Sequence, residues 1–141
     1  MEKNRKHKRS SIITFSESNV DYSALTGDDL EAYNKKTDTD SLLVIYNRNT
    51  NEIFGHLIDI SLGGIMILCD TPIEKNKIYQ LRMNFSLILN SNKNIDFDAE
   101  NVRIWDNFGM ELYFSGFKFV KIDSEDLDII NQLIEKYGVD E

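Results

Sequence analysis

The chain has 141 residues, enough for one domain with a substantial core, and its 41% hydrophobic and 11% aromatic residues are typical of a globular protein. Its formal net charge of −8 argues against general affinity for nucleic acid or for an anionic membrane. No apolar run suits a membrane helix or a signal peptide, and the single Cys69 excludes an internal disulfide and a cysteine-based zinc site. We therefore expect a cytoplasmic protein that is not inserted in a membrane.

The charge is unevenly distributed along the chain. The first nine residues, MEKNRKHKR, contain five of the sixteen basic residues and one acid, which leaves eleven basic and twenty-three acidic residues, a formal charge of −12, in the rest. Residues 1–9 therefore form a basic arm attached to an acidic body. Such an arm is a solvated tail, a phosphate-binding segment or a segment that docks on its own domain.

Residues 10–41 differ in composition from the remainder of the acidic body. They are rich in Ser, Thr, Asn and Asp and predict a flexible acidic and polar linker. Only ALTGDDLEAYNKK, residues 24–36, favours a short helix there, with Thr26 or Asp28 as its N-cap. From residue 42 the chain becomes β-branched and apolar, and we expect the folded domain to occupy residues 42–141.

The folded part predicts six strands and a terminal helix. The strands are expected at residues 42–47, 52–61, 64–69, 78–89, 95–105 and 110–122, and the helix at residues 123–138. RNTN, residues 48–51, predicts a hairpin turn between the first two strands. Six antiparallel strands and one helix predict a mainly β fold, a small closed six-stranded barrel with a C-terminal α-helix.

Side-chain periodicity predicts which residues face the interior. In the fourth strand Leu81, Met83 and Phe85 share one face with Tyr79. The fifth strand changes phase, with Ile95, Phe97 and Ala99 and then Val102 and Ile104 facing inward, which predicts a β-bulge near Glu100. Gly116 predicts a bulge or bend in the last strand. The helix should pack through the stripe of Leu127, Ile130, Leu133 or Ile134, and Tyr137.

The stretch GHLIDISLGG, residues 55–64, carries an acid and a hydroxyl two residues apart and ends in two glycines. Strict alternation puts Asp59 and Ser61 on one face together with Leu57. The other face would then carry His56, Ile58 and Ile60. Two interpretations are open at this point: an ordinary polar outer face that runs into a tight turn, or a platform for a ligand.

Two short patterns favour the ligand platform when they are taken together. Arg5 and Arg9 are four residues apart, and Asp59, Ser61 and Gly64 form D-x-S-x-x-G. With a predicted barrel and C-terminal helix behind them, the chain resembles the PilZ domain, a bacterial receptor module for cyclic di-GMP. The similarity extends over the barrel from residue 41 to residue 137, including a valine–tryptophan strand, a Gly-x-x-Phe strand and the final helix.

The resemblance implies roles for these five residues. Arg5 and Arg9 would contact guanine and phosphate, Asp59 and Ser61 would contact base edges, and Gly64 would be a permissive turn. The chemistry is consistent: an arginine guanidinium fits the guanine O6 and N7 acceptors, and a carboxylate accepts from the opposite N–H edge. In such a protein the arm orders over the ligand and passes a signal to a protein partner, without catalysis and without a cofactor other than the ligand.

The sequence departs from the family pattern in two places. More than thirty residues separate Arg9 from Leu42, and Asn4 stands where a third arginine tends to accompany a stacked ligand pair, which favours one ligand per chain. A PilZ-like protein-interaction module that no longer binds nucleotide is therefore the alternative hypothesis. An OB-type barrel that binds nucleic acid through the basic arm is disfavoured by the acidic body.

Other classes of site have little support in the sequence. His7 and His56 have no partners at ligand spacing, and no nucleophile–base pair or phosphate loop is visible, so we expect neither a metal site nor an enzyme. We expect a monomer or a weak dimer. The sequence carries no output domain that would identify the downstream partner.

Overall fold

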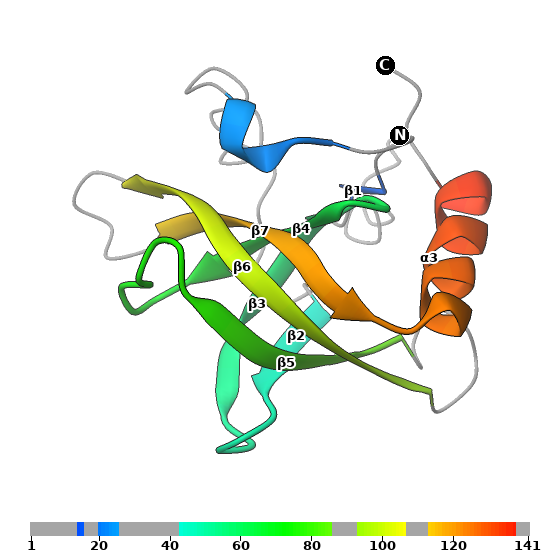
Figure 1. Cartoon of the computed structure of the whole chain (residues 1–141), viewed down its shortest axis with the longest axis horizontal. Helices are drawn as coiled ribbons and strands as arrows, with labels where there is room; N and C mark the ends of the chain where they lie inside the picture. The colour runs from blue at the N-terminus through cyan, green and yellow to red at the C-terminus, as the bar shows by residue number, and fades with distance from the viewer. Residues whose placement is uncertain (1–13, 16–19, 26–42, 86–92, 107–112, 138–141) are drawn as a thin grey trace, which may run out of the picture.

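The computed structural model describes residues 14–15, 20–25, 43–85, 93–106 and 113–137 (Figure 1). Its core is a closed antiparallel barrel in the order β3-β2-β5-β6-β7-β4, which pairing of β3 with β4 closes. The strands are β2 Leu43–Asn47, β3 Ile53–Ile60, β4 Gly64–Cys69, β5 Ile78–Asn84, β6 Asn94–Asp106 and β7 Tyr113–Ile122, and the helix is α3 Ser124–Tyr137. This confirms the predicted mainly β fold, a six-stranded barrel followed by a C-terminal helix.

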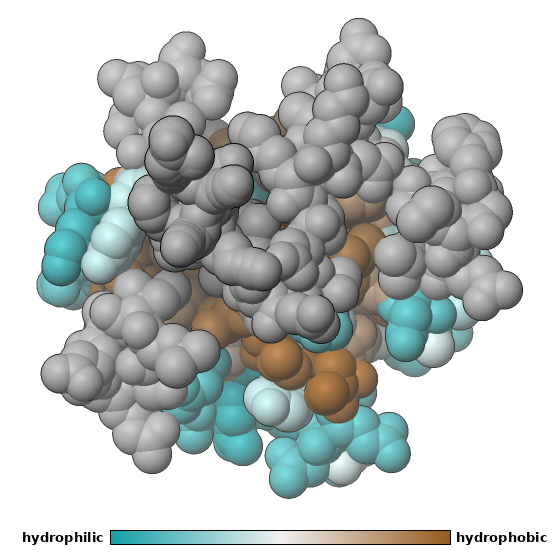
Figure 2. All heavy atoms as spheres, turned by 180° about the vertical axis from the view of Figure 1, so that it is seen from behind, coloured by the Kyte–Doolittle hydropathy of each residue, from teal (hydrophilic) through white to brown (hydrophobic). Residues whose placement is uncertain are grey.

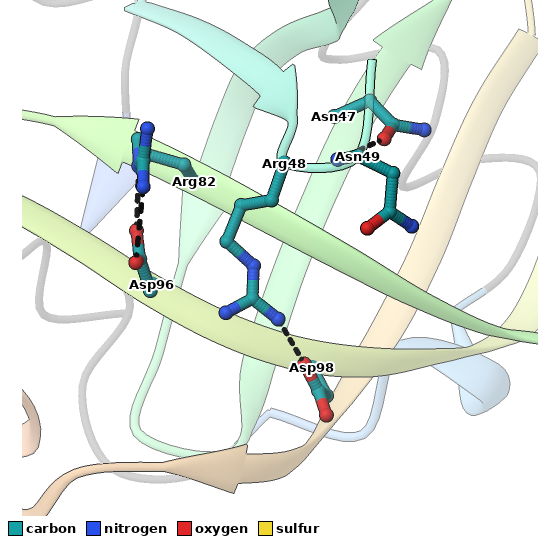
Figure 3. Close-up of polar contacts among 6 residues, drawn as sticks. All are labelled: Asn47, Arg48, Asn49, Arg82, Asp96 and Asp98. Atoms are coloured by element: carbon teal, nitrogen blue, oxygen red, sulfur yellow. Dashed lines mark hydrogen bonds and ion pairs between the residues drawn. The ribbon is translucent and has the colours of Figure 1, made fainter. Parts of the chain in front are cut away.

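The β2–β3 hairpin turn lies where the sequence predicted it, at Arg48–Thr50. The Asn47 Oδ1 atom accepts a hydrogen bond of 2.8 Å from the backbone N–H of Asn49 (Figure 3). It also accepts one of 3.2 Å from the backbone N–H of Thr50. Asn51 completes the turn with a φ of 64°, a left-handed conformation that asparagine tolerates better than most residues. The turn is therefore specified by residues within it, through the Asn47 side chain and the left-handed Asn51.

The main hydrophobic core fills the barrel and continues onto α3, which lies at one end of the barrel (Figure 1). The predicted alternation of β5 is confirmed, because Leu81, Met83 and Phe85 are fully buried in this core. Ile130, Leu133 and Ile134 of α3 are buried in the same core, which confirms the middle of the predicted helix stripe. Tyr137, predicted to belong to that stripe, is exposed at the end of the helix. Seen from behind the view of Figure 1, the described surface carries hydrophilic residues toward its margins and hydrophobic residues near its centre (Figure 2).

A second hydrophobic cluster lies on the outside of the barrel. It consists of Tyr22, Ile58, Met66, Leu68, Trp105 and Phe114. Met66 and Leu68 alternate along β4 with the interior residues Ile65 and Ile67, so the two clusters occupy opposite faces of the same strand. We call this second set the outer cluster.

The bulge predicted near Glu100 is present in β6, between Asn101 and Arg103. Ile104 packs against the interior core as predicted, but Val102 packs against the outer cluster. The inward orientation predicted for Val102 is therefore wrong. Val102 is the extra residue of the bulge, and an extra residue in one strand reverses the face of its neighbours.

A second bulge, in β3, corrects the predicted faces of the GHLIDISLGG stretch. The pairing of β3 with β4 shifts register between Leu57 and Asp59, so that Ile58 is the extra residue. Leu57 and Ile60 consequently both belong to the interior core, while Ile58 belongs to the outer cluster. Asp59 pairs with Met66 of the outer cluster, and its expected companion Leu57 is on the other face.

Part of the segment expected to be a flexible linker is folded onto the barrel. Thr14–Phe15 forms a short strand, β1, parallel to β3, with Thr14 opposite Asp59 and Phe15 opposite Ile60. Tyr22–Ala24 forms a 3₁₀ turn, η2, drawn as the blue coil in Figure 1. The Tyr22 side chain of this turn belongs to the outer cluster. Most of the short helix expected at residues 24–36 lies outside the described residues. None of the helices in the described ranges is both long and apolar enough to cross a bilayer.

Candidate functional site

The bulge in β3 turns Asp59 toward the outside of the barrel, where Ser61 follows at the end of the strand. Both side chains are covered, with exposed fractions of 1% for Asp59 and 0% for Ser61. The Asp59 Oδ2 atom accepts a hydrogen bond of 2.9 Å from the hydroxyl of Tyr22. The Ser61 Oγ atom accepts from the backbone N–H groups of Val20 at 3.4 Å and Gly63 at 3.2 Å. The two predicted site residues are thus adjacent, and the segment 20–25 lies over them.

Gly64 closes the turn after β3 and begins β4. Its carbonyl accepts a hydrogen bond of 2.9 Å from the backbone N–H of Ser61. A Cβ atom at this position would lie 1.9 Å from the carbonyl oxygen of Phe117 in β7. Glycine is therefore required here by the close approach of a neighbouring strand, independently of any ligand.

The surface beneath Tyr22 is formed by Gly116 and the outer cluster. A Cβ atom at Gly116 would lie 2.6 Å from the Cβ of Tyr22 and 3.6 Å from the Trp105 ring. Gly116 lies opposite the β6 bulge, pairing with Arg103. The register shift at Gly116 therefore comes from the extra residue Val102 in β6 and not from a bulge in β7. The missing side chain of Gly116 provides the space in which the Tyr22 side chain lies.

Arg103 fastens the edge of the segment to the barrel. Its Nη1 atom donates a hydrogen bond of 3.0 Å to the carbonyl oxygen of Ser23, and its guanidinium carbon lies 5.2 Å from the centre of the Trp105 ring. That distance is within the range of a cation–π contact. Arg103 is the arginine that the described structure brings beside the predicted platform.

Asp21 organises the turn that presents Tyr22. Its Oδ1 atom accepts hydrogen bonds from the Ser23 hydroxyl at 2.5 Å and the Ser23 backbone N–H at 3.0 Å. These bonds stabilise the charged carboxylate, so they lower the pKa of Asp21 below its ordinary value. The Asp-x-Ser pattern is a local capping signal that fixes the backbone on both sides of Tyr22.

Sequence reasoning did not identify Tyr22 and Arg103 as site residues. For Tyr22 a signal existed: apolar Val20, Tyr22 and Leu25 interrupt a polar stretch around the Asp21 cap, and all three pack on the outer cluster. For Arg103 no signal existed, because an arginine in a predicted strand is ordinarily interpreted as a solvent-exposed side chain. Trp105 is 6% exposed within the outer cluster.

Arg5 and Arg9 lie outside the described residues, so their side chains are not part of this geometry. Chain connectivity nevertheless restricts them. Arg9 precedes Thr14 by five residues, a span of at most about 18 Å when extended, and Thr14 pairs with Asp59. β1 therefore fixes the chain beside Asp59 only five residues after Arg9, although more than thirty residues separate Arg9 from β2.

Comparison with known proteins identifies the family. A model of the PilZ domain matches residues 34–136, which is most of the chain, and the chain therefore belongs to the PilZ domain family. The structure of the Bacillus subtilis inhibitor of motility (MotI/DgrA) is similar with a TM-score of 0.59 and 19% sequence identity. That similarity covers 70% of this chain and 47% of the other, and at this identity it concerns the fold alone. No curated protein sequence matches the chain.

Family membership narrows the class of function. PilZ domains are binding or receptor modules rather than enzymes, and membership in this family supports either a cyclic di-GMP receptor or a PilZ-like interaction module.

Proposed function

We propose that this protein is a non-catalytic receptor for cyclic di-GMP, whose basic arm orders on the ligand and signals to a partner protein. The observation that carries the proposal is the outward-facing pair Asp59 and Ser61, located where β1 tethers the N-terminal arm. A carboxylate and a hydroxyl two residues apart on a sheet face offer acceptors to one purine edge. The expected location is the cytoplasm, with one ligand bound per chain.

Each proposed contact matches a feature of the ligand. The Asp59 carboxylate accepts hydrogen bonds from the N–H groups of one guanine, and Ser61 contacts the same base edge. Arg5 and Arg9 supply planar donors for the guanine O6 and N7 atoms and positive charge for the phosphates. Gly64 keeps the turn beside the ligand free of a side chain.

The signal in this proposal is a change in the N-terminal segment. An arm that orders only when the ligand is present exposes a different surface in the two states, which a protein partner can distinguish. The five positive charges of residues 1–9 are offset by the acidic body when the ligand is absent and by the phosphates when it is bound.

Calorimetric titration of the full chain with cyclic di-GMP tests the proposal. We expect saturable binding with one ligand per chain, and Arg9→Ala should weaken it about 10- to 100-fold, because a bidentate guanine contact contributes about 1–3 kcal/mol. Lys8→Ala is the matched control, since it removes an adjacent charge that has no assigned contact, and it should weaken binding much less. Equal effects of the two variants would mean that the arm contributes only charge.

One observation favours a second candidate function, an interaction module that no longer binds nucleotide. Asp59 and Ser61 are fully covered and already hydrogen-bonded to the segment 20–25. In this case Asp59 and Ser61 serve only to hold that segment on the barrel. Asp59→Ala would then lower the free energy of unfolding, and calorimetric titration of the folded wild-type protein with cyclic di-GMP would give no heat of binding. Binding of cyclic di-GMP by the wild-type chain would exclude this candidate.

A further inference from the structure

We propose that the segment Val20–Leu25 is an autoinhibitory strap that occupies the ligand platform, so that cyclic di-GMP and Tyr22 compete for Asp59. This inference rests on the proposed function, and it assigns to the receptor a closed state that the ligand must open. The strap is defined as Val20–Leu25, which includes η2.

The strap uses the groups that the ligand is proposed to use. Tyr22 donates to Asp59 Oδ2 at 2.9 Å, and the backbone N–H of Val20 donates to Ser61 Oγ at 3.4 Å. With exposed fractions of 1% and 0%, Asp59 and Ser61 cannot be reached by a base while the strap is in place. Occupation by the strap and by a ligand on these two residues is therefore mutually exclusive.

Tyr22 resembles the proposed ligand in both shape and polarity. A phenol is a flat ring with an O–H donor at its edge, and guanine is a flat ring with N–H donors at its edge. The tyrosine side chain is 2% exposed and lies against Gly116, with Trp105 in the same cluster. A surface that accepts one aromatic ring in this way, with a carboxylate at its edge, is suited to accept another.

Removal of the strap leaves the barrel intact. Tyr22 belongs to the outer cluster, whereas the interior core is formed by the strands, Phe15 and α3. The contact between Arg103 and the Ser23 carbonyl fastens the strap at the surface and involves no interior residue. Opening therefore exposes one aromatic cluster and costs far less than unfolding, which is the requirement for a switch between two folded states.

The strap lowers the apparent affinity for ligand. When only a fraction of molecules is open, the apparent dissociation constant equals the intrinsic constant divided by that fraction. A hydrogen bond to a charged acceptor changes such an equilibrium roughly tenfold or more. Weakening the strap should therefore tighten ligand binding, which is the opposite of what loss of an ordinary binding residue does.

Calorimetric titration of Tyr22→Phe with cyclic di-GMP is the primary test. This variant keeps the ring and removes the bond to Asp59, and we expect binding roughly tenfold tighter than wild type. Tyr22→Ala removes the ring as well and should bind at least as tightly as Tyr22→Phe. Tyr79→Phe is the matched control, because the Tyr79 hydroxyl also makes a hydrogen bond, at 3.1 Å from the Glu74 N–H, away from the strap. Its affinity should equal that of wild type.

Hydrogen exchange of a peptide covering residues 20–25 provides a second readout. Ligand binding should make this peptide exchange faster, because the strap leaves the barrel, while the peptides of β3 and β4 exchange at the same rate or more slowly. A strap that merely forms part of the bound site would instead exchange more slowly on ligand addition. That result, or unchanged or weaker binding by Tyr22→Phe, overturns the inference.

The outcomes separate failure of the inference from failure of the proposed function. If wild type binds and Tyr22→Phe binds equally well, the receptor function stands and the strap does not compete. If wild type gives no heat and Tyr22→Ala binds, both proposals are supported and the closed state dominates. If neither protein binds although both are folded by circular dichroism, the receptor function fails, and the competition inferred from it fails as well.

Discussion

At the scale of single residues, the platform is determined by positions where side chains are absent. Gly116 leaves the space in which Tyr22 lies, and Gly64 allows the backbones of β4 and β7 to approach. Both glycines occur in short patterns that the sequence makes visible. What each glycine contacts depends on a strand distant in sequence, and a single sequence does not specify that partner.

Gly64→Ala tests whether the last residue of D-x-S-x-x-G has a structural role. The new Cβ atom would lie 1.9 Å from the Phe117 carbonyl oxygen, a backbone atom that cannot rotate away. We expect the free energy of unfolding to fall by about 2–3 kcal/mol, the range typical of overpacking. Urea denaturation without ligand measures this loss. It should appear as a lower midpoint concentration, with an unchanged slope of unfolding free energy against urea concentration. A loss below about 0.5 kcal/mol, within the range of neutral substitutions, would leave a ligand contact as the reason for this glycine.

At the scale of secondary-structure elements, the sequence predicted the strands well and their faces less well. Uniform alternation holds along β5 and into the residue after it, since Leu81, Met83 and Phe85 are all interior. It fails in β3, because the extra residue Ile58 moves Asp59 away from Leu57. The adjacent apolar pair Leu57–Ile58 within an alternating strand was the available signal for a bulge, since one of the two must change face.

Two ion pairs illustrate how burial affects the coupling energy of an ion pair. One joins the turn after β2 to β6, and the other joins β5 to β6. The Arg48 Nη2 atom lies 2.5 Å from Asp98 Oδ1, and the Arg82 Nε atom lies 2.7 Å from Asp96 Oδ1 (Figure 3). The side chains of the first pair are less exposed than those of the second. A less exposed pair is screened less by water and gains more from its charges.

Double-mutant cycles with alanine should therefore give a larger coupling energy for Arg48–Asp98 than for Arg82–Asp96. We expect about 1 kcal/mol for the first pair and a smaller coupling energy for the second pair, whose side chains are more exposed. Neither pair contacts the strap, so ligand affinity should stay at the wild-type value in all four single variants. A larger coupling for Arg82–Asp96 would mean that its two hydrogen bonds, from Nε and Nη2, outweigh solvent screening.

At the scale of the whole molecule, a closed barrel leaves the N-terminal region as the part that can change. Every barrel strand is paired on both sides, and α3 covers one end of the interior core. The sequence therefore predicted the barrel, which depends on local periodicity, and not the strap, which depends on a few apolar residues in a polar stretch. Arg5 and Arg9 remain predictions, and the β1 tether beside Asp59 is what connects them to the platform.

The stability of the whole barrel should fall in mild acid because of one histidine. Burial lowers the pKa of His56 below its ordinary value of 6.5, an effect that the charge of Asp70 partly opposes. A group whose pKa is lower in the folded state binds protons more readily when the chain is unfolded. Its contribution is therefore fully present above pH 6.5 and is lost as the pH falls through the lower pKa of the folded state.

Urea denaturation at pH values between 7.5 and 5 measures this contribution. We expect the wild-type urea midpoint to decrease as the pH falls. The corresponding loss of unfolding free energy should be less than about 1 kcal/mol, because His56 is partly exposed and solvent screens its charge. His56→Gln cannot titrate and should show a flatter profile over this range. Asp96→Asn is the control. The hydrogen bond from Arg82 lowers the pKa of Asp96, so protonation of Asp96 should reduce stability only at lower pH. The stability profile of Asp96→Asn should therefore run parallel to that of wild type down to pH 5. If His56→Gln and wild type lost stability in parallel, the acid sensitivity would arise from the carboxylates of the acidic body instead.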